Sequence, residues 1–201
     1  SVELKNLLAG NAADITVREL VDKVGDRGFG LLLLVLSLPS ALPVPAAGYS
    51  VPFGILLLLL AFQMIIGRQR PVFPKRFESL TIKAGMAEKM LGSASWVFSK
   101  IEWLIRPRLK WIGWRGGRVF MGVLVLIMAC LMMIPIPLTN TAPAFVVFLI
   151  GIGLTEDDGA FAIGACIVGV FAVALYASLI YAIILYGPEV ADQVKDAIKG
   201  F

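Results

Sequence analysis

The sequence predicts an all-α integral membrane protein that forms a single membrane domain over residues 1–201. Hydrophobic residues make up 59% of the chain and charged residues 16%, which is too little polar surface to cover a water-soluble globule of this size. Two long apolar segments are each interrupted by prolines, and a third, from Ala160 to Tyr186, is unbroken. We therefore expect two proline-broken helical hairpins of a re-entrant type, repeated along the chain, followed by one long transmembrane helix over residues 160–187.

Residues 14–25 have the pattern of a short amphipathic helix outside the bilayer. Thr16 and Glu19 have the spacing of a capping box, in which two side chains satisfy backbone N–H groups at the helix start. The apolar residues that follow recur at helical spacing and form one face: Val17, Leu20, Val21 and Val24. The segment lacks the short basic-then-apolar pattern of a cleaved signal, so we expect it to stay with the mature protein.

The first hairpin is expected over residues 27–67. Its arms, at roughly 29–42 and 51–66, flank the stretch PSALPVPAAGYSVP, which holds four of the chain's eleven prolines. At about 1.5 Å per residue each arm reaches about 21 to 24 Å, against a hydrocarbon core of about 30 Å. Two interpretations stay open: the proline loop lies inside the membrane, or the arms just cross a thin bilayer and the prolines shape a turn at its far face.

Residues 68–117 form a basic connector that we expect at the membrane surface in the cytoplasm. With Arg118 they carry twelve lysines and arginines and three glutamates, a net charge of +9. All four tryptophans fall within residues 96–114, and tryptophan among basic residues is typical of a segment at the level of the lipid headgroups. The predicted partners are anionic membrane lipids and not nucleic acid, because the basic residues flank membrane segments. A cytosolic domain with its own core is the alternative.

The second hairpin is expected over residues 118–158, with arms at 119–134 and near 143–154 around IPIPLTNTAP. It resembles the first hairpin at a constant offset of 91 positions. The pairs that share this offset are Arg27 and Arg118, Phe29 and Phe120, Ser50 and Thr141, and Pro52 and Pro143. The offset predicts an internal duplication, and both copies should enter from the same face because the connector is not apolar enough to cross. Residues 188–201 are expected to form a C-terminal amphipathic helix.

The two proline loops predict a ligand site. Ser50 and Thr141 precede the second arms and can cap them. A proline then falls in each first helical turn, where a missing N–H does no harm. Helix N-termini with unpaired N–H groups are ready binding sites for an anion. The predicted anion site comprises the loop residues Pro45, Ser50, Pro137, Asn140 and Thr141. In the alternative interpretation the prolines only shape turns and bind nothing.

Ionisable and polar residues near the arms extend the candidate site. Arg27 and Arg118 stand before the first arm of each hairpin, whereas Glu156 and Asp157 follow the last arm. An ion pair between one of these arginines and one of these acids, near the mouth of a cavity, would allow coupling to protons or ions. The alternative is that all four anchor helices at the interface. Gln63, within the second arm, is predicted either to hydrogen-bond between helices or to line the cavity.

The residue inventory argues against an enzyme. The chain has no histidine, which removes the commonest general base and metal ligand. Cys130 and Cys166 lie inside apolar runs, where a free thiol ordinarily acts as small hydrophobic filler. The sequence holds no metal-ligand cluster, no glycine-rich phosphate loop and no nucleophile beside a base. We expect no catalytic residue, no metal and no cofactor.

The chain resembles the ExoD family of exopolysaccharide-synthesis membrane proteins from about residue 14 to residue 186. The most specific motifs are the R-G-F-G start at 27–30, the P-x-P at 43–45 and the Q-x-x-x-G-R-x-R-P exit at 63–71, with Pro74 three residues further on. Phe73 stands where the family pattern has a tryptophan, which keeps an aromatic anchor. The resemblance implies a bacterial inner-membrane protein linked to synthesis or export of extracellular polysaccharide. It implies the process and not the chemistry.

Two functions follow from these observations. The first is a small transporter or lipid-linked translocation factor with an anion site between the proline loops. About five membrane segments make a thin wall for a transport pathway, so we expect a homodimer to complete that pathway. The second is a non-transporting scaffold that holds polysaccharide-synthesis enzymes through the basic connector. In either case the charge distribution predicts that the N-terminus, the connector and Glu156 to Asp158 are cytoplasmic, with the segment after Pro188 outside.

Overall fold

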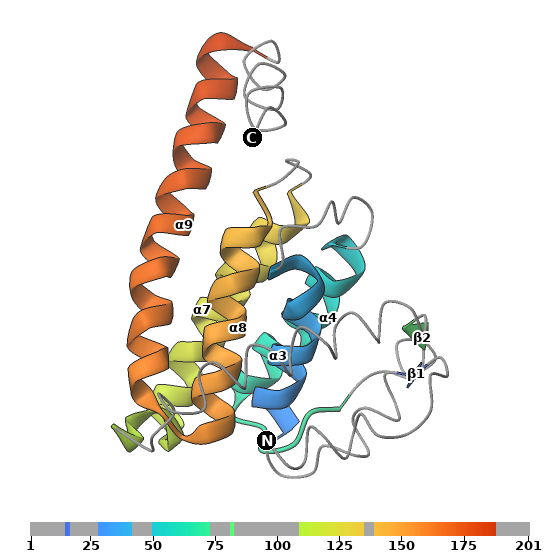
Figure 1. Ribbon diagram of the computed structural model, residues 1–201, viewed down its shortest axis with the longest axis vertical. Helices are drawn as coiled ribbons and strands as arrows, with labels where there is room; N and C mark the ends of the chain where they lie inside the picture. Colours follow the sequence, from blue (N-terminus) through green and yellow to red (C-terminus); the bar gives the residue numbers. More distant parts are fainter. Residues whose placement is uncertain are drawn as a thin grey trace.

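The computed structural model describes residues 15–16, 28–41, 50–72, 81–82, 109–134 and 139–187. Nearly all of these residues are helical (Figure 1). The α-helices are α3 (Gly28–Ala41), α4 (Ser50–Ile66), α7 (Arg115–Met133), α8 (Thr141–Glu156) and α9 (Gly159–Tyr186), and a short 3-10 helix, η2 (Lys110–Gly113), precedes α7. Two-residue strands β1 (Ile15–Thr16) and β2 (Thr81–Ile82) pair in antiparallel register. The predicted all-α class is confirmed, with this one small ladder added.

Helices α3, α4, α7 and α8 pack as a four-helix bundle in which the two hairpins interlock. The closest pairs are α3 with α8 and α4 with α7, whereas helices of the same hairpin touch less extensively. Both close pairs are antiparallel: Gly30 near the start of α3 meets Thr155 near the end of α8, and Gly54 near the start of α4 meets Met133 at the end of α7. Consequently α3 and α7 end, and α4 and α8 begin, at one end of the bundle, which we call the loop end. We call the opposite end the base.

Glycine allows α3 and α8 to approach until their backbones touch. A Cβ atom on Gly151 would lie 2.7 Å from the backbone nitrogen of Leu34, and one on Gly30 would lie 2.7 Å from the backbone nitrogen of Thr155. No larger residue fits either position without moving a helix. The nearby hydroxyls bond to carbonyls of their own helices, with Thr155 donating to Gly151 and Ser37 donating to Leu34. This crossing fixes how one hairpin sits against the other.

The centre of the bundle is apolar and rich in leucine and methionine. Each of the four helices contributes buried side chains, among them Leu32, Leu33, Leu36, Leu57, Leu60, Met64, Met121, Met128, Met132, Val147 and Ile150. Methionine suits this role because its flexible thioether fills irregular gaps between helices. Helix α3 is buried on nearly every face, which agrees with its uniformly apolar sequence.

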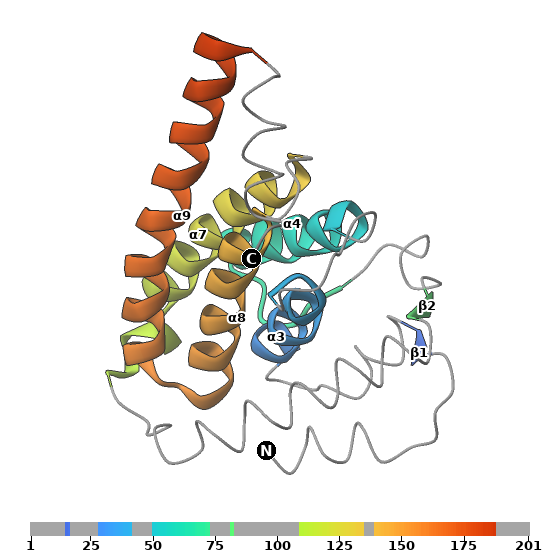
Figure 2. The same cartoon turned by 45° about the horizontal axis from the view of Figure 1, so that its top comes forward.

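Helix α9 packs along α8, and less extensively on α7, through small residues. Its buried side consists of Gly159, Ala162, Ala165, Gly169, Ala172 and Tyr176, which recur every three or four residues. Helix α9 continues for ten residues beyond Tyr176. Figures 1 and 2 show this part of α9 projecting past the end of α7 and the start of α8. The predicted unbroken helix is confirmed, because α9 runs straight through Gly169 to Tyr186.

Two helices, α7 and α9, are long and apolar enough to cross a membrane. Only 33% of the α7 window and 17% of the α9 window is buried, whereas the core helix of a soluble protein would be mostly covered. The other three helices are also apolar but have only 14 to 17 residues. These features indicate a membrane protein in which long and short apolar helices pack together.

The observed helices match the predicted arms closely, with one useful difference. Helix α7 begins at Arg115, so Arg118 lies inside its first turn and not in front of the arm. In this first turn Arg115 is exposed and Arg118 is half-buried, so neither charge is fully buried. The pairing of β1 with β2 places residues 15–16 beside residues 81–82 of the connector. Most of residues 14–25, most of the connector and residues 188–201 lie outside the described residues.

Candidate functional site

The loop end holds the starts of α4 and α8. These helices begin at Ser50 and Thr141, which are 91 residues apart, the offset that the sequence predicts for the two hairpins. They occupy opposite corners of the bundle, since each is flanked by α3 and α7 and not by the other. Pro143 lies in the first turn of α8, as expected. Pro45 and Pro137, and the side chain of Ser50, lie outside the described residues.

The start of α8 differs from the prediction in its capping residue. Thr141 is the first helical residue, and Asn140 occupies the N-cap position without a side-chain capping bond. The Asn140 side chain is used elsewhere: its Oδ1 accepts a hydrogen bond of 2.9 Å from the hydroxyl of Tyr176. The same hydroxyl accepts a bond of 2.9 Å from Thr139 Oγ1. A fully buried tyrosine on α9 therefore holds the two residues that lead into α8.

Tyr176 was not singled out from the sequence. Tyrosines near the ends of apolar runs usually mark the membrane interface, and Tyr181 and Tyr186 on the same helix are exposed. Tyr176 differs because it lies deep in its run, 17 residues after the start of α9. That position is the one signal in the sequence that could have identified it.

Ser40 is the second loop-end residue that the sequence did not single out. It belongs to the last turn of α3 and is 2% exposed, and its hydroxyl has no hydrogen-bond partner. Phe29, Leu33 and Leu36 precede it at spacings of four, three and four residues, and all three belong to the central core. Ser40 therefore follows these residues at helical spacing on one side of α3. Ser37, one turn earlier, is also buried but bonds to Leu34.

Gln63 lies near the base, and its side chain forms hydrogen bonds with backbone groups. Its Nε2 donates to the carbonyls of Leu59, at 3.1 Å, and Val72, at 2.9 Å. The amide N–H of Val72 donates back to Oε1 at 2.8 Å. These described bonds fasten the exit segment to the end of α4. The glycine of the same motif, Gly67, has a φ of +83° and ends α4 with a left-handed turn that other residues rarely adopt.

The acidic residues after α8 form a tight turn between two helices. Glu156 is the last residue of α8, and Asp157 follows it in a left-handed conformation with its N–H bonded to the carbonyl of Gly153. Asp158 is 1% exposed and caps α9, accepting a bond of 3.0 Å from the N–H of Ala160. Among the described residues no ion pair joins Arg118 to Glu156 or Asp157. The predicted alternatives that involve Arg27 lie outside the described residues.

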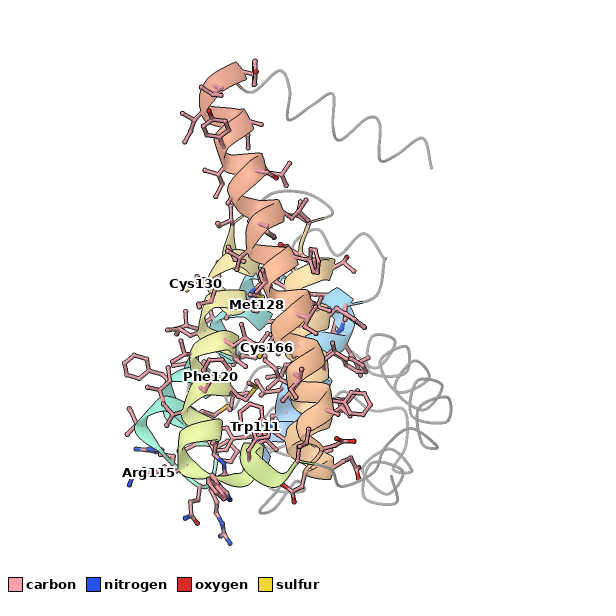
Figure 3. The ribbon with its side chains drawn as sticks, turned by 90° about the vertical axis from the view of Figure 1, so that its left-hand side faces the viewer. Trp111, Arg115, Phe120, Met128, Cys130 and Cys166 are labelled. Atoms are coloured by element: carbon pink, nitrogen blue, oxygen red, sulfur yellow. The ribbon has the colours of Figure 1, made fainter. Side chains whose placement is uncertain are left out.

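The base is held together around Trp111. Figure 3 shows Trp111 beside the first turns of α7 and α9, with Arg115 at the same end of the molecule and Cys130 toward the other end. The indole ring packs against Phe120 at a centroid distance of 6.3 Å. Gly159 lies so close that a Cβ atom there would meet Trp111 Nε1 at 2.6 Å. Trp111 thus packs between the helices at this end, whereas Trp114 is exposed.

The predicted site residues therefore divide into two groups. Asn140, Thr141 and the helix start at Ser50 lie at the loop end, whereas Gln63, Arg118, Glu156 and Asp157 lie at the base. Helix α8, whose 16 residues rise about 1.5 Å each, separates the groups by about 23 Å. One ligand cannot contact both. The loop end, with its helix N-termini and buried polar side chains, is the better candidate for binding.

Comparison with known proteins decides the family. The family model described as "Exopolysaccharide synthesis, ExoD" matches residues 1–178. The chain belongs to the ExoD family. It is 32% identical over 155 residues to Protein ExoD of Rhizobium meliloti. The matched region covers 75% of this chain and 64% of that protein. The chain is 45% identical over 135 residues to an uncharacterized protein of Synechocystis sp., covering 67% of this chain and 64% of that one.

This ExoD family protein spans about two thirds of the length of the curated relatives it matches, 64% in both cases. No solved structure matches it. Across the part of the chain that the structure describes, no group of three or more acidic, cysteine or histidine side chains could hold a metal ion. The loop end of this ExoD family member presents neutral hydrogen-bonding groups and the positive ends of two helix dipoles. Both kinds of group are suited to binding an oxyanion.

Proposed function

We propose that this ExoD family protein is a small transporter or lipid-linked translocation factor of exopolysaccharide synthesis or export, with an anion site between its two proline loops. One observation carries the proposal: the starts of α4 and α8, 91 residues apart in sequence, lie at the same end of one bundle. Each helix start directs backbone N–H groups and a partial positive charge toward that end. An anion at the loop end would be attracted by both.

The length of α9 supports a loop end within the membrane. Tyr176 is level with the loop end because it bonds to Thr139 and Asn140. Ten further residues, about 15 Å of helix, continue beyond it. Their apolar side chains are largely exposed, including Ile180, Ile184 and Leu185. If α9 enters a hydrocarbon core of about 30 Å at its first residue, Tyr176 and the loop end lie about 26 Å further along, inside the core but near its far boundary. Non-helical backbone at that depth is stable where it lines a wet cavity or is covered by protein.

The interlocked packing supports two related hairpins. The first helix of each hairpin packs antiparallel on the second helix of the other, so the two halves make equivalent contacts. Such an arrangement is expected for a duplicated unit whose copies enter from the same face. A homodimer in the bacterial inner membrane would place a second bundle beside the first and complete a pathway past the loops.

Reconstitution tests the proposal. Purified protein in liposomes is expected to move inorganic phosphate or a polyprenyl-phosphate lipid across the bilayer faster than liposomes that lack it. Radiolabelled phosphate uptake and the accessibility of the lipid phosphate to an external phosphatase measure the two activities separately. Background rates for both, with protein shown to be folded by its thermal transition, would contradict the transport proposal.

A scaffold for polysaccharide-synthesis enzymes is the second candidate, and the connector favours it. The connector region carries a net charge of +9 and pairs with the N-terminal segment through β1 and β2. A basic surface of this kind binds anionic lipids or acidic partner proteins. Background transport combined with co-purification of synthesis enzymes would place this function first.

A further inference from the structure

The end of α4 and the start of α7 bring two arginines together at the base. Arg68 follows Gly67, whose left-handed turn ends α4, and Arg115 is the first residue of α7. Figure 3 shows Arg115 at this end of the molecule. A Cβ atom on Gly67 would lie 3.3 Å from Nε of Arg115 and 3.5 Å from its Nη2, so the guanidinium lies against the turn that carries Arg68. Both arginines are exposed, and among the described residues neither forms an ion pair.

The helix ends at this place do not neutralise the two charges. The end of α4 carries a partial negative charge and the start of α7 a partial positive charge, each of about half an elementary charge, so the two nearly cancel. Helix α4 has no acidic residue, and the first turn of α7 has none either but contains a further cation, Arg118. The junction of the two helices therefore has an excess of positive charge, which a bound anion would offset.

Exposed apolar side chains adjoin these arginines on both helices. On α4, Phe62 is 58% exposed and Ile66 is 60% exposed, one turn apart on the same face. On α7, Phe120 is 53% exposed, whereas Trp114, directly before Arg115, is 75% exposed. The two helices thus change from exposed apolar residues to exposed cationic residues at the same level of the bundle. An exposed tryptophan at such a boundary is typical of the lipid headgroup region.

We propose that Arg68 and Arg115 together bind the phosphate of an anionic phospholipid whose acyl chains lie along Phe62 and Ile66. Arginine suits this role because its planar guanidinium donates two parallel hydrogen bonds to phosphate oxygens. The exposed apolar and cationic groups follow one another in the order in which a phospholipid presents its chains and its phosphate. The bound lipid joins the end of the first hairpin to the start of the second. The site is separate from the loop end, so it applies to a transporter and to a scaffold alike.

Lipid binding to the purified protein tests the site. Native mass spectrometry is used to count bound lipids as phosphatidylglycerol or phosphatidylcholine is added to the protein in detergent. The wild type should bind the first phosphatidylglycerol at least about tenfold more tightly than phosphatidylcholine. The double variant Arg68→Gln/Arg115→Gln should lose about tenfold or more of the affinity for phosphatidylglycerol, since hydrogen bonds to a charged phosphate are lost. Arg115→Lys should fall between, because lysine keeps the charge but not the two-pronged geometry.

Two controls distinguish this site from other ways of attracting an anion. Lys83→Gln/Lys89→Gln removes the same amount of charge from the middle of the connector and should bind phosphatidylglycerol like the wild type. Equal weakening by this control would mean diffuse attraction and would overturn the site. Soluble glycerol 3-phosphate, which has the phosphate but no acyl chains, should not displace the lipid at matched concentration. Displacement by it would make the occupant a free anion and not a phospholipid.

Thermal unfolding separates loss of the lipid from loss of the fold. A ligand that binds only the folded state raises the melting temperature, so the wild type should melt higher in phosphatidylglycerol nanodiscs than in phosphatidylcholine nanodiscs. The double glutamine variant should lose this difference, whatever its own melting temperature in phosphatidylcholine. A difference as large as that of the wild type would show that Arg68 and Arg115 do not hold the lipid.

Discussion

Asp157 illustrates how a single charged residue can be explained by the backbone. The sequence suggested a coupling carboxylate, but the residue occupies a left-handed position with a φ of +51° at the end of α8. Aspartate and asparagine tolerate this conformation better than most residues, and glycine tolerates it best. Asp158, the next residue, supplies the cap of α9. The LTEDDG motif therefore encodes a sharp turn between two helices.

Replacing Asp157 distinguishes the turn from a coupling role. Asp157→Gly should leave stability unchanged or raise it by up to about 1 kcal/mol, because glycine adopts a positive φ without strain. Asp157→Ala should lower stability by about 1 kcal/mol. Both should support exopolysaccharide production in a complementation assay, with thermal unfolding measured in parallel. Loss of production in the stable glycine variant would restore Asp157 to the functional site.

At the scale of elements, the crossing of α3 and α8 is the contact on which the bundle depends. The two backbones meet where Gly30 faces Gly151, and α3 contains no charged residue, so no ion pair sets the register of the two helices. Close backbone contact between glycines gives strong van der Waals packing, which drives association of helices in membranes. The position of each hairpin relative to the other is set there.

Enlarging that contact should separate the hairpins. Gly151→Ala places a methyl group 2.7 Å from the Leu34 nitrogen and should destabilise the fold by about 1 to 3 kcal/mol. Gly164→Ala is the matched control on α9, because nothing lies within 4 Å of its added Cβ atom. The control should be neutral or stabilising by about 0.5 to 1 kcal/mol. Unfolding in detergent measures both, and equal stability of the two variants would show that α3 and α8 do not touch as described.

At the scale of the whole molecule, the structure constrains the orientation of the chain in the membrane. The β1 and β2 strands tie the N-terminal segment to the connector, and the turn after α8 lies at the base with the start of α7. A connector region with a net charge of +9 should remain in the cytoplasm. We therefore expect α9 to cross the membrane once, with the residues after Tyr186 on the other side.

Labelling with an impermeant thiol reagent tests this orientation. Single cysteines replace Lys83, Asp157 and Lys195 in a background without the exposed Cys130 and the half-buried Cys166. Reagent added outside intact cells should modify position 195 and leave positions 83 and 157 unmodified until the membrane is opened. Equal protection of positions 83 and 195 would overturn the orientation.

The sequence by itself determined the class of protein and the positions of its helices. Prolines, apolar runs and charged boundaries are local signals, so the limits of α3, α4, α8 and α9 could be predicted within about two residues. The family and the 91-residue offset between the two helix starts were also readable from the chain. These features depend on the solvent and on near neighbours in sequence.

Only the tertiary structure decided which helices pair and which polar side chains meet. Helices such as α3, α8 and α9 are apolar on every side, so their sequences do not indicate which face turns toward a neighbour. Tyr176 lies 36 residues from Asn140, and its role appears only when α9 lies along α8. Ser40 and Ser37 differ in the same way, since their spacing alone does not show which hydroxyl finds a partner. In a membrane, where most residues are apolar, packing and not hydrophobicity selects these contacts.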